Sequence, residues 1–267
     1  MGKEEGYSGL FDPWVCCAQP ADAIRDPEQL RSAPAEWIPA RVPGTVAAAL
    51  RDAGAWSLDR PLEADASDWW FRTTFASPEI LDGAPCVLCL DGLATLAEVW
   101  LNGEPLLRTE NMFRAYRAEI ASRLKPRNEL VIAFRSLTAR LAQKRPRPRW
   151  KTNLVQHQQL RWHRATLLGR IPGWSPPVAP VGPWRDVRLE TGPVLVEDSW
   201  LNCALEEETG FVRLRATARS RRPIERAILR VGERETPVAI QSRAQGVALE
   251  AELPVASPRL WWPHTHG

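Results

Sequence analysis

The sequence has little of the chemistry that marks most enzyme classes. It contains four histidines and five cysteines in 267 residues. It has no Gly-rich loop with the spacing of a phosphate-binding or dinucleotide-binding turn. No apolar run reaches the roughly 18 residues that a membrane-spanning helix requires. The N-terminus lacks a charged stretch followed by an apolar one, so we expect no secretory signal and a cytoplasmic protein that does not engage a membrane.

The few cysteines and histidines are not spaced as metal ligands or as a catalytic triad. An odd number of cysteines suits a reducing compartment. Cys86 and Cys89 lie three apart in an apolar run with strand character, where they would point to opposite faces of a sheet. The histidines form two pairs without a neighbouring carboxylate or thiol: His157 and His163, and His264 and His266. We therefore expect no metal site, no cofactor and no catalytic residue in this chain.

Acidic residues are missing from one long interval. Between Glu129 and Asp186 there is no Asp or Glu, although the interval is rich in arginine and lysine. One interpretation is a surface for a uronic acid or a sulfated sugar, because arginine pairs with such anions through two hydrogen bonds. The favoured alternative is a solvated loop, since prolines interrupt the basic run 144–149. Nucleic acid is the weakest option, because the net charge is only +3 and no binding motif is present.

The pattern that does dominate is the period-two alternation of β-strands. Residues 69–75 alternate in this way, residues 87–90 form a continuous apolar run, and Asn102-Gly103 follows the alternating run 97–101 as a type I′ hairpin turn. Residues 130–134 and 187–189 indicate further strands. Helix is predicted only for residues 46–53 and, more weakly, 118–124. Many short strands separated by Gly and Pro favour a β-sandwich up to residue 191.

A second block begins near Gly192-Pro193 and extends to residue 267. Its predicted strands are 200–205, 212–218, 227–231 and 247–253, of which the second alternates apolar residues with arginines and Thr217. We expect an immunoglobulin-like β-sandwich that is incomplete, because such a sandwich usually has seven strands. An exposed edge of this sheet would invite pairing with another chain. The oligomeric state is left open.

Several short motifs occur in an order that resembles one family. They are Val42-Pro43-Gly44-Thr45, Asp91-Gly92-Leu93-Ala94-Thr95 and Asn111-Met112-Phe113-Arg114, with residues 37–41, 68–73, 99–103 and 182–190. Together they resemble the sugar-binding, jelly-roll-like domain of glycoside hydrolase family 2 in its β-mannosidase-like branch. The second block resembles the family's immunoglobulin-like domain, including the stretch Leu260-Trp261-Trp262-Pro263-His264. The fold class implied is all-β.

The resemblance also implies what the chain lacks. Family members continue into a TIM barrel whose two glutamates hydrolyse a β-glycosidic bond with retention. Such a barrel requires about 250 residues, and the sequence ends at Gly267. We therefore expect the chain alone to be inactive, to brace the missing C-terminal barrel and to lend a rim to its carbohydrate site.

The resemblance points to one loop as that rim. In β-mannosidases it carries Gly-Trp-Asp-Trp-Gly-Pro, whereas here residues 168–177 contain Gly173-Trp174 and no Asp. This departure puts mannose specificity in question. The substrate-binding residues expected at the rim are Arg164, Arg170, Trp174, Asn111 and Arg114.

Two other functions remain open from the sequence. The chain has 13 Trp and 2 Tyr, and Trp162, Trp174 and Trp184 could form the flat surface of a stand-alone carbohydrate-binding or scaffolding module. Alternatively, the incomplete second sandwich could accept a strand from a partner protein.

Overall fold

The structure is a computed structural model that describes residues 11–80, 84–146, 149–155, 157–171, 173–220, 222–244 and 246–265. The chain divides into two compact units. The first comprises the residues up to Glu79 together with Cys86–Glu190, and the second comprises Ile80–Pro85 and the residues from Thr191 onward. Strands account for most of the secondary structure, so the prediction of an all-β fold is confirmed.

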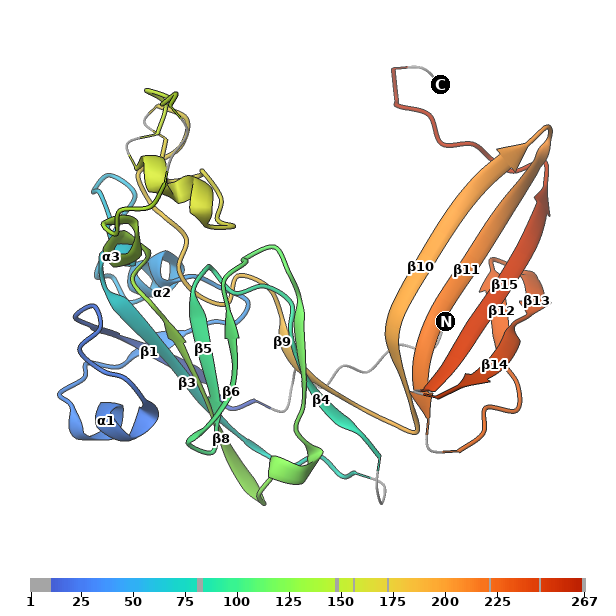
Figure 1. The fold of residues 1–267 in the computed structure, drawn as a ribbon, viewed down its shortest axis with the longest axis horizontal. Coiled ribbons are helices and arrows are strands. Elements are labelled where there is room, and N and C mark those ends of the chain that lie inside the picture. Colours follow the sequence, from blue (N-terminus) through green and yellow to red (C-terminus); the bar gives the residue numbers. More distant parts are fainter. Residues whose placement is uncertain are drawn as a thin grey trace. The chain divides into compact units, whose positions relative to one another are not determined.

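A six-stranded antiparallel sheet forms the larger layer of the first unit (Figure 1). Its central strand β3 (Asp68–Ala76) pairs with β1 on one side and β8 on the other. The other strands of this sheet are β1 (Trp14–Gln19), β2 (Ile38–Ala40), β8 (Arg127–Phe134), β5 (Ala97–Leu101) and β6 (Glu104–Thr109). Alternating residues of β3 face the core, where Phe71 stacks edge-on against Phe134 of β8 at 5.3 Å.

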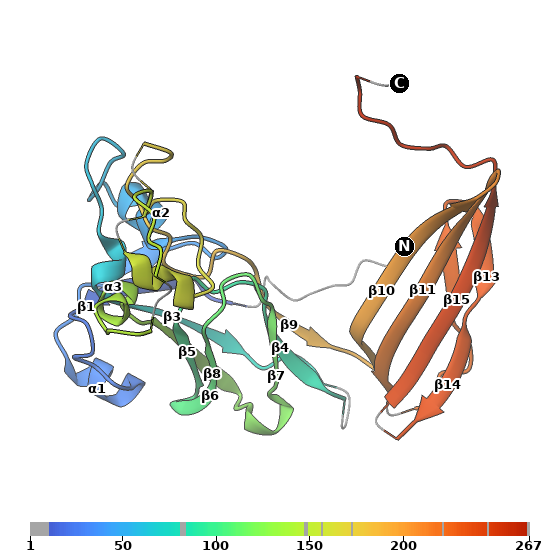
Figure 2. The ribbon, with the colours of Figure 1, turned by 45° about the horizontal axis from the view of Figure 1, so that its top comes forward.

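A three-stranded sheet forms the second layer. It has the order β7 (Tyr116–Glu119), β4 (Cys86–Leu90), β9 (Val187–Thr191). Every residue of β4 is buried, as the continuous apolar run predicted. Both views show this sheet beside the six-stranded one (Figures 1 and 2). The resulting β-sandwich confirms the predicted fold of this part of the chain.

The predicted hairpin at Asn102-Gly103 is confirmed. Both residues have positive φ, 57° and 85°, as a type I′ turn requires. The Asn102 side chain also accepts a hydrogen bond from the Glu129 N–H (3.0 Å) and donates to Asn128 Oδ1 (2.9 Å). Asn128 is buried; its Oδ1 accepts from Asn102, and its Nδ2 donates to Lys125 O at 2.8 Å. The bonds of Asn102 fix the turn onto β8.

Helices are short and occur where a side chain caps them. α2 (Val46–Asp52) confirms the prediction for residues 46–53, and Thr45 caps it. The prediction of helix at 118–124 was wrong, because Ala118 and Glu119 pair with β4 and only the 3₁₀ turn Ala121–Arg123 follows. Two helices were not predicted: α1 (Pro27–Ser32), capped by Asp26, and α3 (Leu137–Leu141), capped by Ser136.

The second unit contains a four-stranded antiparallel sheet with the order β10-β11-β15-β14 (Figure 2). The bounds are β10 (Val194–Glu206), β11 (Thr209–Ser220), β15 (Gly246–Ala256) and β14 (Ala239–Arg243). A separate hairpin joins β12 (Ile228–Val231) and β13 (Arg234–Pro237). Sequence analysis missed β13 and β14, which are short and largely exposed. The immunoglobulin-like assignment stays a prediction.

Within the described residues, no helix is both long enough and apolar enough to cross a membrane.

Candidate functional site

The three sequence motifs meet around one segment, residues 181–186, just before β9. Each motif forms a hydrogen bond with this segment. The bonds are Gly44 N–H to Pro183 O (2.8 Å), Ala94 N–H to Gly182 O (3.0 Å) and Trp184 Nε1–H to Met112 O (2.9 Å). Segments far apart in the sequence are thereby tied to one place, so the motifs are first of all architectural.

Gly92 shows why the second motif needs glycine. A Cβ at this position would lie 2.7 Å from Trp184 Nε1 and 3.0 Å from its Cε2. Side chains larger than hydrogen would therefore displace the Trp184 ring. Trp184 also packs edge-on against Phe113 at 6.4 Å. Trp184 therefore packs the closing segment, residues 181–186, against the 111–114 loop.

Two of the predicted rim residues, Asn111 and Arg164, lie side by side. Their backbones form a parallel bridge, and Met112 N–H donates to Arg164 O at 3.0 Å. The Asn111 side chain accepts a hydrogen bond from the Phe113 N–H at 3.0 Å, so it stabilises its own turn. Arg114 places its guanidinium 5.4 Å from the centre of the Tyr116 ring. The structure thus joins the 111–114 loop to the segment that precedes residues 168–177.

Arg170 is paired inside the protein. Its Nη1 lies 2.6 Å from Asp65 Oδ2, and the side chains are only 9% and 8% exposed. Asp65 Oδ2 accepts no hydrogen bond from a described residue. The contact with Arg170 is therefore an ion pair whose atoms are close but not aligned as a hydrogen bond. The pair ties the base of the 168–177 loop to the 3₁₀ turn Ala64–Ala66.

Trp174 lies on the same loop. It is the one aromatic side chain among the predicted rim residues, and it is 74% exposed. The loop closes on itself, since Gly169 N–H donates to Ser175 Oγ at 2.7 Å. Gly169 has φ +78°, and a Cβ there would lie 2.0 Å from Val178 O. Ser175 follows Gly173-Trp174 where the β-mannosidase motif has Asp. The loop therefore presents an aromatic side chain from a fixed base, without that carboxylate.

The basic interval is only partly a free surface. Arg135 binds Glu98 (2.5 Å) and Asp68 (2.9 Å), and Arg140 lies 3.3 Å from Asp22. These acidic partners come from distant parts of the sequence, so composition within the interval did not reveal them. The run 144–149 lies partly outside the described residues, which omit 147 and 148.

The cysteine pair 86/89 has the character of packed apolar residues. Both thiols are buried. Burial raises the pKa of Cys86 to about 11 and that of Cys89 to about 12. Both are therefore protonated at neutral pH and poor metal ligands. The described residues contain no group of three or more side chains that could hold a metal ion. His266 lies outside them.

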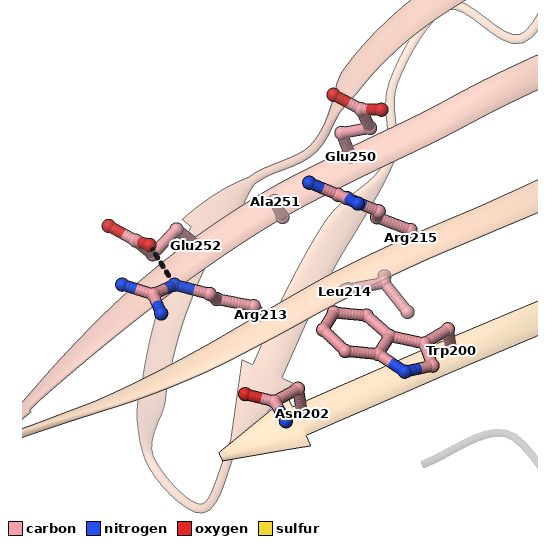
Figure 3. Close-up of a pocket in the computed structure, with 8 residues that line it drawn as sticks. All are labelled: Trp200, Asn202, Arg213, Leu214, Arg215, Glu250, Ala251 and Glu252. Carbon is pink, nitrogen blue, oxygen red and sulfur yellow. Dashed lines mark hydrogen bonds and ion pairs between the residues drawn. The ribbon is translucent and has the colours of Figure 1, made fainter. Parts of the chain in front are cut away.

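A concave face on the sheet of the second unit offers another candidate (Figure 3). Two rows of side chains cross its strands: Trp200, Arg215 and Glu250, and Asn202, Arg213 and Glu252. Arg213 already pairs with Glu252 and Glu206, and Arg215 lies 5.7 Å from the Trp200 ring. Such cross-strand pairs stabilise a sheet, so the side chains of this face are explained without a bound ligand.

Comparison with known proteins identifies relatives that match most of this chain. A family model described as "Glycosyl hydrolase 2 galactose-binding domain-like" matches residues 25–185. β-Mannosidase B of Thermothelomyces thermophilus is 31% identical over 216 residues, which are 75% of this chain and 24% of that protein. β-Mannosidase B of Aspergillus terreus is 30% identical over 74% of this chain and 24% of its own length. The chain thus spans about a quarter of these relatives.

Solved structures show the same fold at lower identity. A β-D-mannosidase from Dictyoglomus thermophilum superposes with a TM-score of 0.68 and 21% identity, over 96% of this chain and 32% of its own. An exo-chitosanase from Amycolatopsis orientalis gives 0.62 and 16%, over 94% of this chain and 29% of its own. The described strands therefore have counterparts in larger glycosidases.

Proposed function

This chain belongs to the family of glycosyl hydrolase 2 galactose-binding-like domains, and from that membership we propose that it is the non-catalytic N-terminal region of a β-mannosidase-like glycosidase. Such an enzyme hydrolyses O-glycosyl bonds of carbohydrates. In this role the chain braces a catalytic barrel and contributes a rim to the sugar site. The proposal is supported by relatives that are β-mannosidases about four times as long as the aligned region.

The observation that carries the proposal is the 168–177 loop. Its base is held by the buried Arg170–Asp65 pair and by the Gly169–Ser175 hydrogen bond. Its outer side exposes Trp174 and Leu168. Large apolar side chains on an anchored loop are costly to leave in water and are typical of a contact surface. A flat Trp ring also suits the face of a sugar.

Three paired carboxylates of the first unit fit a non-catalytic role. A retaining glycosidase needs two carboxylates about 5–5.5 Å apart, one of them free to attack the sugar. Asp65, Asp68 and Glu98 are each bound to an arginine instead. The chain therefore supplies structure and contact surface while another part of the protein supplies chemistry.

Two measurements test the proposal. The intact protein from its native source should have a mass well above the 30.0 kDa of this chain, and a mass near 30.0 kDa would contradict the role. The chain alone should not release p-nitrophenol from p-nitrophenyl β-D-mannoside, β-D-galactoside or β-D-glucuronide, and turnover above buffer would also contradict it.

The rim is tested by Trp174→Ala in the intact protein. Loss of one aromatic contact with the sugar should raise KM about tenfold, which corresponds to about 1.4 kcal/mol of binding free energy. The control is Trp261→Ala, which removes a similarly exposed Trp from the second unit. An unchanged KM for Trp174→Ala, or an equal change in both variants, would remove the rim from the proposal.

A further inference from the structure

A cavity of about 290 Å³ lies in the first unit, at the end of the six-stranded sheet. Its walls come from β5, the end of β6, α3 with the turn after it, and the end of the 3₁₀ helix Gln158–Trp162. The side chains that matter to its chemistry are Arg108, Glu110, Arg140, Arg145, Trp162 and His163. Its volume is near the lower end of small-molecule pockets, about 300–1,000 Å³, which suits one sugar ring.

The cations around the cavity differ in how they are paired. Arg108 lies 3.3 Å from Glu98, and Arg140 lies 3.3 Å from Asp22. Arg145 has no ion pair or hydrogen bond with any described residue. Its planar guanidinium is therefore available to bind a carboxylate through two hydrogen bonds.

Glu110 restricts the kind of anion that fits. It lies in the same cavity and has no ion pair with a described residue. A compact anion such as sulfate would form an ion pair with Arg145, but the Glu110 carboxylate would repel it. A uronic acid carries its charge at one end and hydroxyl donors elsewhere on the ring, so it can satisfy both side chains.

His163 adds a half-buried ring to the wall of the cavity. Its ring is half-buried, and Nε2 is fully covered without a hydrogen-bond partner among the described residues. Burial, followed by the charge of Arg145, lowers the pKa of His163, so the ring is neutral at pH 7. Because Nε2 is covered, His163 contributes an uncharged ring to the cavity wall and adds no positive charge that would compete with Arg145.

Trp162 supplies an apolar wall. Its side chain is about half-exposed and lines the same cavity. Sugar rings have an apolar face of C–H groups, which a Trp ring covers well. The cavity thus combines a guanidinium and a carboxylate without ion pairs among the described residues, an uncharged imidazole and an aromatic face.

We propose that this cavity binds a single acidic sugar residue of the uronic acid class. The carboxylate lies on Arg145, a hydroxyl lies on Glu110, and one ring face lies against Trp162. This site is built by the first unit alone. It goes beyond the proposed role toward a catalytic barrel, so the two can fail separately.

The test is a protein-observed NMR titration of the full 267-residue chain with D-glucuronate, D-glucose, D-glucosamine and sulfate. D-Glucuronate should bind about tenfold more tightly than D-glucose, the scale of one charge-assisted hydrogen-bonded contact. Arg145→Gln should remove that tenfold preference and leave D-glucose unchanged. Trp162→Ala should weaken both sugars and leave sulfate unchanged.

The matched control is Arg149→Gln, which removes the same charge from an exposed position outside the cavity. It should leave all four titrations unchanged. The proposal is overturned if sulfate binds as tightly as D-glucuronate, if D-glucosamine binds more tightly, or if Arg149→Gln has the effect of Arg145→Gln. Absence of D-glucuronate binding also overturns it, without bearing on the mass or turnover tests of the proposed function.

Discussion

Asp68 is the acidic residue on which most of the local polar network depends. It is 1% exposed and accepts hydrogen bonds from Arg135 (2.9 Å) and from the Ser136 N–H (2.7 Å). Arg135 in turn binds Glu98 and lies 4.9 Å from the Trp70 ring. One buried carboxylate therefore holds the start of α3 and the end of β8 against β3.

Asp68→Asn should lower the free energy of unfolding by about 3 kcal/mol, at the lower end of the cost of breaking a buried ion pair, because Arg135 keeps Glu98. Urea denaturation followed by circular dichroism measures it. Asp22→Asn is the control, since the Asp22–Arg140 pair is exposed and should contribute less than about 1 kcal/mol. Equal losses in the two variants would refute the special role of Asp68.

Glu190 makes the stability of the first unit depend on pH. Burial alone would raise its pKa, but the hydrogen bond and charge of Arg117 and the charge of Arg188 hold the pKa of Glu190 below the ordinary 4.5. A carboxylate with a lowered folded pKa stabilises the fold fully above pH 4.5, and this contribution is lost as the pH falls through the folded pKa.

Glu190→Gln should therefore destabilise the chain at neutral pH and flatten its acid dependence. The difference in unfolding free energy between the two proteins should be constant above pH 4.5 and shrink below it. Denaturation curves at a series of pH values give this difference. A difference that grows as the pH falls would show that the sign of the linkage is wrong.

At the scale of elements, the closing segment 181–186 depends on glycine. Gly92→Ala would place a methyl group 2.7 Å from Trp184 Nε1. The ring or the backbone must shift, so we expect a loss of about 1–3 kcal/mol, as for other overpacked sites. Gly192→Ala is the control, because the nearest atom to its Cβ is 3.7 Å away. Equal unfolding midpoints for Gly92→Ala and wild type would contradict the close approach.

The burial of the cysteines within the strands predicts which thiols react with a reagent in solution. Cys16, Cys17, Cys86 and Cys89 are buried, and Cys203 alone among the five is exposed. Ellman's reagent should therefore titrate one thiol in the native chain and five after denaturation. Cys203→Ser should abolish the native reaction. Fast labelling of a second thiol would show that β1 or β4 opens readily.

Sequence patterns predicted elements whose signals are local. The alternation of residues 97–101 and the Asn102-Gly103 turn determine one hairpin, because strand face and turn type depend on neighbouring residues. Asp26 before Pro27 was also a local helix signal, an N-cap followed by proline, and it was missed. The helix prediction for residues 118–124 was wrong because their spaced apolar residues suit a short helix, whereas pairing of Ala118 and Glu119 with β4 decides their conformation.

The candidate sites were less predictable because they depend on distant pairs. Sequence analysis named Arg170 as a substrate-binding residue of the rim, and only the fold brings Asp65 to it. Arg145 belongs to the same basic interval and has no such partner within the described residues. Composition cannot separate these two arginines, because their difference lies in which carboxylate the tertiary structure places nearby.

At the scale of the whole molecule, the two units differ in how well they bury apolar residues. The family model covers residues 25–185 of the first unit, where β4, β5 and β8 are largely buried. In the second unit, Leu201 and Leu205 on one face of β10 are 60% and 50% exposed. Exposed apolar side chains in a row are typical of a contact surface.

Leu201→Lys combined with Leu205→Lys should therefore leave the unfolding free energy within about 0.5 kcal/mol of wild type, as for other surface substitutions. It should also lower the fluorescence of anilinonaphthalene sulfonate bound to the native chain, because two apolar contacts for the dye are lost. Thr217→Lys with Gln241→Lys adds the same charge to exposed positions on the opposite face of the sheet. If this control lowers dye binding equally, charge explains the effect. If the leucine variant unfolds more easily, Leu201 and Leu205 are core residues and the face is not a contact surface.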